Sequence, residues 1–280
     1  MSKTKDRIRE SNLRYKQSLG QNFIYDEDLL ASLVADAGID KEDDVLEIGP
    51  GAGSLTKHLC AAAHHVLSLE LDERLIPLLN AFMAGQDNFS LVQGDVMAVD
   101  LEEITGELRK PFAVVANIPY YITTPLITRL LTSGLPISKL ALMVQKEVAE
   151  KILSSPGEEG WGPLAVRCQY LCEPYLAQIV PASCFTPVPK VDSAFIVLPR
   201  RQEPAVRVKD EKAFSLGDWV FIPGVRKAVL EGTPEFTAYA VNPEGKVTPF
   251  QVSVGDLTPD ERQIIADGCL INYYRNHPVD

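Results

Sequence analysis

Short apolar segments recur along the first half of the chain, and four of them share one arrangement. They occupy residues 45–48, 65–69, 89–92 and 112–116. Apolar runs of this length between turn residues predict buried β-strands. A glycine turn follows the first run, and the others lead to Glu70, Asp95 and Asn117. Because open α/β sheets bind ligands at the edge where their strands end, we expect these polar residues to form a ligand site.

The glycine turn reads Gly-Pro-Gly-Ala-Gly at residues 49–53 and leads into a helix expected to begin near Ser54. Glycine lets a backbone approach a ligand closely, and a helix N-terminus presents unpaired N–H groups. Glu70 ends the second run, at the position where a doubly wound fold places a ribose-binding carboxylate. The G-x-G-x-G spacing differs from the G-x-G-x-x-G of dinucleotide sites, and Glu47 stands before the first glycine. We therefore expect a different adenosine-containing ligand.

The tetrapeptide Asn117-Ile118-Pro119-Tyr120 at the end of the fourth run has the groups needed to hold an extruded adenine. The exocyclic N6 is a poor nucleophile, so an alkylating protein must accept hydrogen bonds from its amino hydrogens while stacking on the ring. The Asn117 Oδ1 and the Ile118 carbonyl can accept, and Tyr120 can stack. Taken alone, such a tetrapeptide is more often a strand end that turns at a proline. The three strands before it favour a methyl-transfer site that uses S-adenosyl-L-methionine.

Taken together, these segments resemble the ribosomal RNA adenine N6-dimethyltransferases over about residues 8–214. The motifs that carry the resemblance are residues 19–23 (Leu-Gly-Gln-Asn-Phe), 47–56, Glu70, Gly94-Asp95, 117–125, 145–149 and 184–193. The resemblance implies a doubly wound, Rossmann-like α/β methyltransferase domain with S-adenosyl-L-methionine as cofactor. Residues 145–147 are interpreted as the start of a helix without a catalytic role.

The resemblance also assigns roles to individual residues. The residues expected to bind the cofactor are Asn22, Ile24, Gly49, Gly51, Glu70, Asp95 and Asn117. Glu70 would accept from the ribose hydroxyls and Asp95 from the adenine amino group of the cofactor. Asn117 would lie between cofactor and substrate, while Tyr120 and Phe185 would sandwich the target base. The alternatives are a solvated strand end for Glu70, a turn residue for Asp95 and a core residue for Phe185.

The activity implied is dimethylation of N6 on two adjacent adenosines of small-subunit ribosomal RNA during ribosome assembly. The expected partners are this RNA and the immature small subunit, with no metal and no membrane, for a monomer in the cytoplasm. One alternative is a large-subunit RNA dimethyltransferase of the macrolide-resistance type. Another is a ribosome-assembly or RNA-binding factor that has kept the cofactor fold and lost turnover.

Charge is the main feature that runs against RNA binding. The chain of 280 residues has a formal net charge of -11, which opposes approach to a polyphosphate. The first twenty residues are an exception, because six basic side chains stand there against two acidic ones. We interpret residues 1–11 as a basic arm that guides phosphates, and residues 12–204 as the methyltransferase domain.

The resemblance ends near residue 214, where family members continue into a small, basic, helical domain, and we interpret residues 205–280 as an atypical appendage that replaces this domain. The pattern instead predicts a short strand near residue 219, a helical turn at 225–228 and two strands around the turn at 242–245. Thr258, Pro259 and Glu261 then form a capping box at the start of a last helix. This appendage faintly resembles the end of the swivelling domain of aconitase-like hydro-lyases. It has none of their three cluster-binding cysteines, so no activity is carried over.

Overall fold

The computed structural model describes residues 22–155, 158–202, 219–233, 235–242, 245–253 and 258–266. The chain divides into two compact units, residues 1–206 and residues 207–280. The basic arm expected at residues 1–11 lies outside the described residues. In the described part of the chain, no helix has the length and apolar character needed to cross a bilayer.

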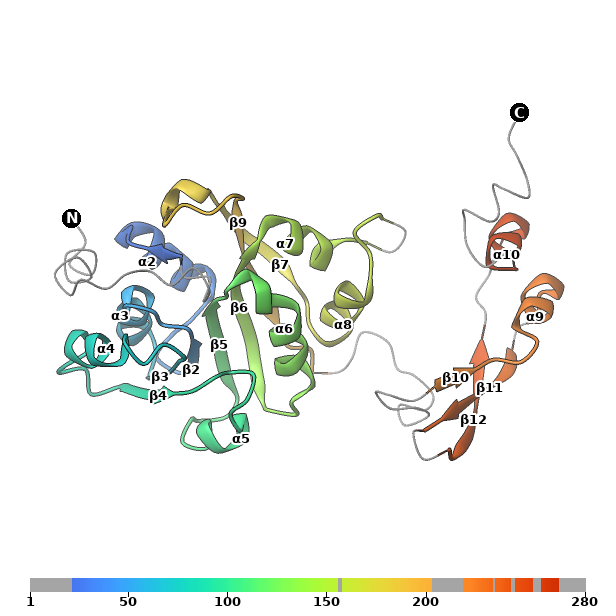
Figure 1. Ribbon diagram of the computed structural model, residues 1–280, viewed down its shortest axis with the longest axis horizontal. Coiled ribbons are helices and arrows are strands. Elements are labelled where there is room, and N and C mark those ends of the chain that lie inside the picture. Colours follow the sequence, from blue (N-terminus) through green and yellow to red (C-terminus); the bar gives the residue numbers. More distant parts are fainter. Residues whose placement is uncertain are drawn as a thin grey trace. The chain divides into compact units, whose positions relative to one another are not determined.

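Seven strands form the central sheet of the first unit, in the order β4-β3-β2-β5-β6-β9-β7 (Figure 1). Their bounds are β2 Asp44–Ile48, β3 His65–Glu70, β4 Phe89–Gln93, β5 Phe112–Asn117, β6 Ile137–Gln145, β7 Tyr175–Val180 and β9 Ser193–Pro199. β2 to β6 are parallel, and β9 pairs antiparallel with both β6 and β7. The four apolar runs are the strands β2 to β5, which confirms that part of the sequence interpretation.

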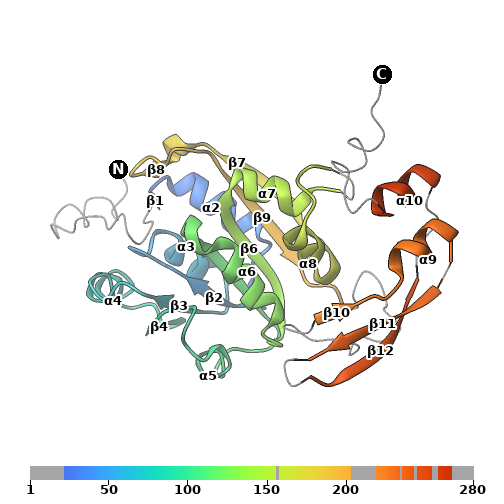
Figure 2. The same ribbon diagram turned by 45° about the vertical axis from the view of Figure 1, so that its right-hand side comes forward.

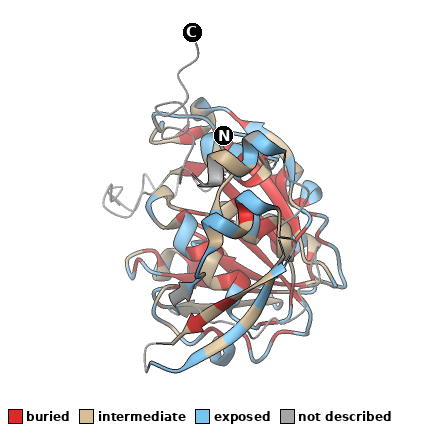
Figure 3. Ribbon diagram, turned by 90° about the vertical axis from the view of Figure 1, so that its right-hand side faces the viewer, coloured by how far each residue is buried: buried red, intermediate tan, exposed pale blue. Residues whose placement is uncertain are grey.

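Helices cover both faces of this sheet. On one face lie α2 (Glu27–Asp36), α3 (Ser54–Ala62) and α4 (Ile76–Phe82). On the other lie α5 (Leu101–Ile104), α6 (Thr123–Thr132), α7 (Lys146–Leu153) and α8 (Pro163–Leu171). Strand side chains alternate between two cores, as Val45 and Leu46 do. The inner strands are mostly buried, whereas the outer strands β4 and β7 are more exposed (Figure 3). The doubly wound α/β class is therefore confirmed.

The order of the strands places the ligand site. From β2 the chain moves outward through β3 and β4, and from β5 it moves the other way through β6. A crevice forms at such a reversal because the two neighbouring connections leave the sheet in opposite directions. β2 and β5 are fully buried up to Ile48 and Ala116, so only their carboxyl ends meet the crevice.

Two short strands join the start and the end of the domain. β1 (Phe23–Ile24) pairs antiparallel with β8 (Phe185–Thr186), so that Ile24 lies opposite Phe185. Both side chains belong to the core beneath α2 and α3. This pairing fixes the segment that follows Asn22 against the far end of the domain.

The second unit has its own antiparallel sheet, β10 (Trp219–Phe221), β11 (Glu235–Val241) and β12 (Val247–Ser253), with helices α9 (Val225–Glu231) and α10 (Pro259–Ala266) (Figure 2). The expected strands are confirmed, and the helical turn is the start of α9. The capping box is also present, since Glu261 N–H donates to Thr258 Oγ1 at 3.3 Å and Thr258 N–H to Glu261 Oε2 at 2.8 Å. The last helix is described as far as Ala266.

Candidate active site

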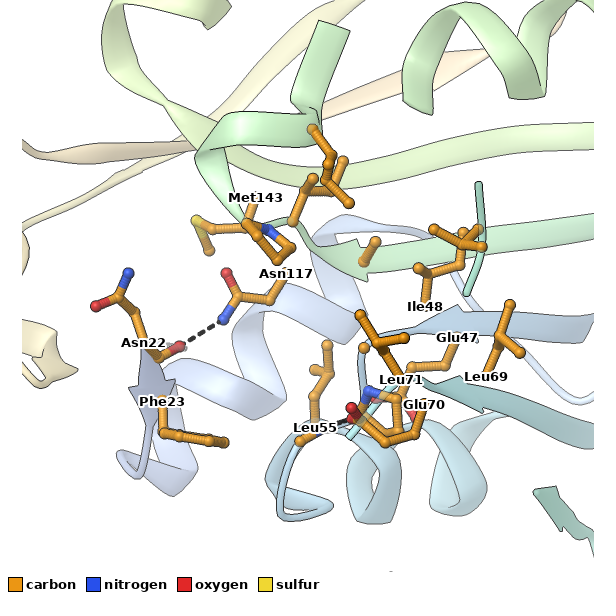
Figure 4. A pocket seen from close by; sticks show the side chains of 18 of the residues that line it. Asn22, Phe23, Glu47, Ile48, Leu55, Leu69, Glu70, Leu71, Asn117 and Met143 are labelled. Atoms are coloured by element: carbon orange, nitrogen blue, oxygen red, sulfur yellow. Dashed lines mark hydrogen bonds between the residues drawn. The ribbon is translucent and has the colours of Figure 1, made fainter. Parts of the chain in front are cut away.

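A cavity of about 200 Å³ opens at the carboxyl edge of the sheet, where the strand order reverses. The expected residues that line it are Asn22, Ile24, Gly49, Gly51, Glu70, Asp95, Asn117 and Tyr120. They come from β1, the glycine turn and the ends of β3, β4 and β5. Figure 4 shows Asn22 and Asn117 on one side of the cavity and Glu47 and Glu70 on the other. Segments far apart in the sequence thus converge as the strand pattern predicted.

The glycine turn is shaped by backbone conformations that other residues rarely adopt. Gly51 has φ of 61°, and a Cβ placed there would lie 2.6 Å from Cε1 of Phe23. Its N–H donates to Glu70 Oε2 at 2.9 Å, so the turn is tied to the end of β3. The backbone can follow this path because glycine has no Cβ that would be crowded at positive φ.

Glu70 is held at the cavity wall by two backbone donors. Besides Gly51, the Asp72 N–H donates to its Oε1 at 2.8 Å, and the residue is only 5% exposed. Burial raises the pKa of Glu70, and the N–H groups of Asp72 and Gly51 partly offset this effect. Two carboxylate oxygens with remaining lone pairs face a cavity, which suits a pair of vicinal hydroxyls as donors.

Glu47 is more buried than Glu70. Its hydrogen-bond partners were not predicted from the sequence. Its Oε2 accepts from Thr56 Oγ1 at 2.7 Å and from Ser68 Oγ at 2.6 Å, and the residue is 1% exposed. Burial raises the pKa of Glu47 to about 7, against the two hydroxyl donors, and the nearby Glu70 charge adds to the rise. The carboxyl therefore links β2, which carries it, to the first turn of α3 and to β3.

The amide of Asn117 has a defined orientation. Its Nδ2 donates to the main-chain carbonyl of Asn22 at 2.9 Å (Figure 4). Because a carbonyl only accepts, this contact assigns the nitrogen to Asn22 and leaves Oδ1 as an acceptor. Asn117 is partly exposed at the cavity, while the neighbouring Ile118 side chain is buried.

Tyr120 begins the short helix η2 (Tyr120–Ile122) directly after Pro119 and lines the cavity. Its hydroxyl hydrogen-bonds to Ser193 Oγ at 2.9 Å, with either oxygen able to donate. Tyr121 also lines the cavity and is 58% exposed. An aromatic ring is therefore present where the resemblance places a base-stacking face.

Phe185 is not where the resemblance places it. The residue is 2% exposed, packs in the core shared by α2 and α3, and is absent from the cavity lining. The cause is the pairing of β8 with β1, which points this ring inward beside Ile24. In this structure the core alternative describes Phe185, and Tyr120 is left without a second ring from that position.

Asp95 fits both of its interpretations. The side chain is exposed, lines the cavity and accepts from Met97 N–H at 2.8 Å, which is a turn contact. One carboxylate oxygen makes that bond, so the other can accept from a ligand. Among the described residues, no group of three His, Cys, Asp or Glu is placed to hold a metal ion.

The cavity fits the cofactor that the resemblance implies. Its lining includes Ser54, the first residue of α3, whose hydroxyl oxygen is buried and has no hydrogen-bond partner among the described residues. A buried hydroxyl beside a helix N-terminus suits the carboxylate of an amino acid. Leu71 and Val96 add apolar wall beside Glu70 and Asp95, as an adenine ring requires.

Comparison with known proteins points to the same family as the sequence motifs. A family model described as ribosomal RNA adenine dimethylase matches residues 12–216. Ribosomal RNA small subunit methyltransferase A of Enterococcus faecalis is 43% identical over 216 residues, which are 76% of this chain and 73% of that protein. The protein of the same name from Clostridium acetobutylicum is 43% identical over 211 residues, covering 75% and 76%.

Two solved structures share the fold at appreciable identity. A dimethyladenosine transferase from Plasmodium falciparum is 30% identical with a TM-score of 0.58, over 64% of each chain. The 23S rRNA methyltransferase ErmE is 33% identical with a TM-score of 0.59, over 66% of this chain and 72% of that one. On the strength of the match over residues 12–216 and the geometry of its cavity, the chain belongs to the ribosomal RNA adenine dimethylase family and has S-adenosyl-L-methionine as its cofactor.

Proposed function

We propose that this chain dimethylates N6 of two adjacent adenosines in small-subunit ribosomal RNA, acting as a monomer on the immature small subunit. The observation that supports it best is the anchored amide of Asn117, whose acceptor oxygen remains available at a cavity lined by buried carboxylates and Tyr120. An acceptor and an aromatic face at one strand end are what an extruded adenine needs.

Each lining residue has a part in this proposal. Glu70 and Asp95 bind the adenosine of the cofactor, while Asn22, Ile24, Gly49 and Gly51 form the wall around its remaining part. Asn117 Oδ1 and the Ile118 carbonyl accept from the target amino group, and Tyr120 stacks on the base. Stacking of this kind contributes on the order of 1 to 3 kcal/mol, which offsets most of the cost of extruding the base.

The chemistry requires positioning more than a strong base. When bound, S-adenosyl-L-methionine supplies an electrophilic methyl: the N6 lone pair forms the new N–C bond, the S–C electron pair returns to sulfur, and one N–H proton leaves. Asn117 stabilises the charge that develops on N6, because its neutral oxygen accepts from the acidified N–H until water takes the proton. Both acceptors lie on the carboxyl side of β5, so one rigid segment sets the line of transfer.

The choice of RNA rests on the relatives. The two curated relatives at 43% identity have names that specify the small ribosomal subunit, whereas the structure named for 23S RNA is 33% identical. This difference supports the small-subunit substrate over the macrolide-resistance alternative. The second unit, residues 207–280, overlaps the family match only over residues 207–216, so the first unit carries the proposal.

The deciding experiment expresses the chain in a host that lacks its own small-subunit dimethyladenosine transferase and maps methylated adenosines in both ribosomal RNAs. We expect dimethyladenosine at two adjacent small-subunit positions. Modification of the large-subunit RNA instead would support the macrolide-resistance type, and binding to small subunits without modification would support the assembly factor.

Asn117→Asp tests the residue that carries the proposal. It keeps the size of the side chain but places a negative charge at the site and removes the donor to the Asn22 carbonyl. We expect methyl transfer to fall by orders of magnitude while S-adenosyl-L-methionine binding, measured by calorimetry, survives. Glu150→Gln, on the exposed surface of α7, is the control. Near-normal turnover of the Asn117→Asp variant would refute the role of Asn117.

A further inference from the structure

Ser193 is a buried residue that the function proposed above does not use. It is 0% exposed and begins β9, where it pairs with Gln145 of β6 and with Val180 of β7. Its hydroxyl hydrogen-bonds to the hydroxyl of Tyr120 at 2.9 Å, across 73 residues of sequence. The central sheet is thus joined to the ring at the cavity through one side chain.

This contact fixes the Tyr120 ring at both ends. At its base, Pro119 has φ of -56° and leads directly into η2, so the backbone that carries the ring has little freedom. At its tip, the phenol oxygen is held by a hydroxyl on a strand that is hydrogen-bonded on both sides. A ring held in this way keeps one plane towards the cavity instead of sampling several rotamers.

We propose that Ser193 is a positioning residue for the second methyl transfer, acting through the plane of the Tyr120 ring; this inference rests on the proposed function. The unmodified amino group has two N–H donors for the Asn117 oxygen and the Ile118 carbonyl. Each transfer replaces one N–H by N–CH3 and releases one proton, so the monomethylated base has one donor left. The second substrate is therefore held less by hydrogen bonds and more by stacking on Tyr120.

Removing the Ser193 hydroxyl should therefore change the ratio of monomethylated to dimethylated adenosine. Loss of the Ser193 hydroxyl frees the Tyr120 ring to tilt, which weakens stacking in both methyl transfers. The rate of the second transfer should fall more, because the monomethylated base is held mainly by stacking. The chain then releases more RNA after one methyl. A loss of folded protein would lower both steps together and leave the proportion of products unchanged.

The test compares Ser193→Ala, Tyr120→Phe and the double variant in the full chain, acting on immature small subunits. Nucleoside mass spectrometry gives the ratio of N6-methyladenosine to N6,N6-dimethyladenosine at matched total methylation. We expect each single variant to raise this ratio several-fold and the double variant to raise it no further, because both remove the same hydrogen bond. The affinity for S-adenosyl-L-methionine should stay unchanged, since Ser193 does not line the cavity.

Ser138→Ala is the matched control. Ser138 lies in β6, and its buried hydroxyl has no hydrogen-bond partner among the described residues, so its removal should leave the product ratio unaltered. An unchanged ratio in Ser193→Ala, or additive effects in the double variant, would overturn the inference. If Ser193→Ala does not fold, Tyr120→Phe decides alone, because it removes the bond without altering the sheet. Absence of any methyladenosine from the unaltered chain would instead refute the proposed function.

Discussion

Glu47 and Glu70 show how single side chains set the character of this site. Both carboxyls are almost completely buried, both have a raised pKa, and burial is the largest cause in each case. Glu70 is aimed at the cavity, whereas Glu47 accepts two hydroxyl donors inside the wall. The wall can tolerate two such groups because each has at least two donors within hydrogen-bonding distance.

The raised pKa of Glu47 makes stability depend on pH. The carboxyl titrates near 4.5 when unfolded and near 7 when folded, so between these values the native state keeps a proton that the unfolded chain has lost. Stability should therefore fall as pH rises through this window and level off above it, by on the order of 1 to 3 kcal/mol. Glu47→Gln should flatten the fall in Tm between about pH 5 and about pH 8.

Glu150→Gln, an exposed glutamate of α7, controls for the loss of a surface charge and should keep the original slope. The slope is the informative quantity, since Glu47→Gln can lower Tm at every pH by disturbing the contacts with Thr56 and Ser68. A variant whose Tm still falls as steeply as that of the unaltered chain would show that another group titrates in this range.

At the scale of elements, β1 and the preceding residue, Asn22, form part of the cavity wall. Its Phe23 ring lies against Gly51, its neighbour Asn22 holds Asn117, and its partner β8 comes from the far end of the domain. The segment of residues 22–24 thus contacts the glycine turn, the end of β5 and β8. A displacement of β1 should therefore also displace residues that line the cofactor cavity.

Gly51→Ala tests this coupling, with Gly85→Ala as its matched control. Both glycines have positive φ, 61° and 87°, so alanine costs about 1 to 2 kcal/mol of backbone strain at either position. Only at Gly51 does the added methyl meet Phe23, because nothing lies within 4 Å at Gly85. We expect a loss in Tm in both variants, larger in Gly51→Ala because of the Phe23 contact, and a marked loss of S-adenosyl-L-methionine affinity, measured by calorimetry, in Gly51→Ala alone.

Removing Phe23 from the Gly51→Ala chain gives the methyl room, so Phe23→Ala in that background should recover part of the affinity. Equal affinities of the Gly51→Ala and Gly85→Ala variants would show that the Phe23 contact does not shape the cofactor wall.

The elements also show what the sequence could and could not predict. β2, β3 and β5 were predictable because a strand buried on both faces leaves a continuous apolar run, and the run of the edge strand β4 was bounded by turn residues. The polar residues that follow the runs of β3, β4 and β5 marked the cavity. The capping box at Thr258 was predictable because its spacing is local. The burial of Phe185 and the bond from Ser193 to Tyr120 were not, because each depends on a pairing between distant segments.

At the scale of the whole molecule, each of the two units is built around its own β-sheet. The seven-stranded sheet and every residue of the cavity lie within residues 22–202, while the three-stranded sheet lies within residues 219–253. The net charge of -11 belongs to the entire chain, and the appendage contributes to it with eleven acidic against eight basic side chains from Ala205 onward. The acidic balance of this segment therefore opposes, and does not assist, attraction of RNA phosphates.

A chain ending at residue 206 should keep the cofactor site. Because no cavity residue is removed, we expect S-adenosyl-L-methionine affinity equal to that of the full chain by calorimetry, and a cooperative thermal transition. The full chain is the control in the same buffer. Loss of binding in a shortened chain that still melts cooperatively would show that the appendage contributes to the cofactor site.

The anchor of Asn117 has a consequence for how this family member can vary. The group that holds the amide is a peptide oxygen, so every amino acid at position 22 presents it equally. Point mutations there can alter the side chain that lines the cavity without releasing the amide of Asn117. An insertion or deletion that reroutes the main chain would break this hydrogen bond, so position 22 should tolerate substitution far better than a change in segment length.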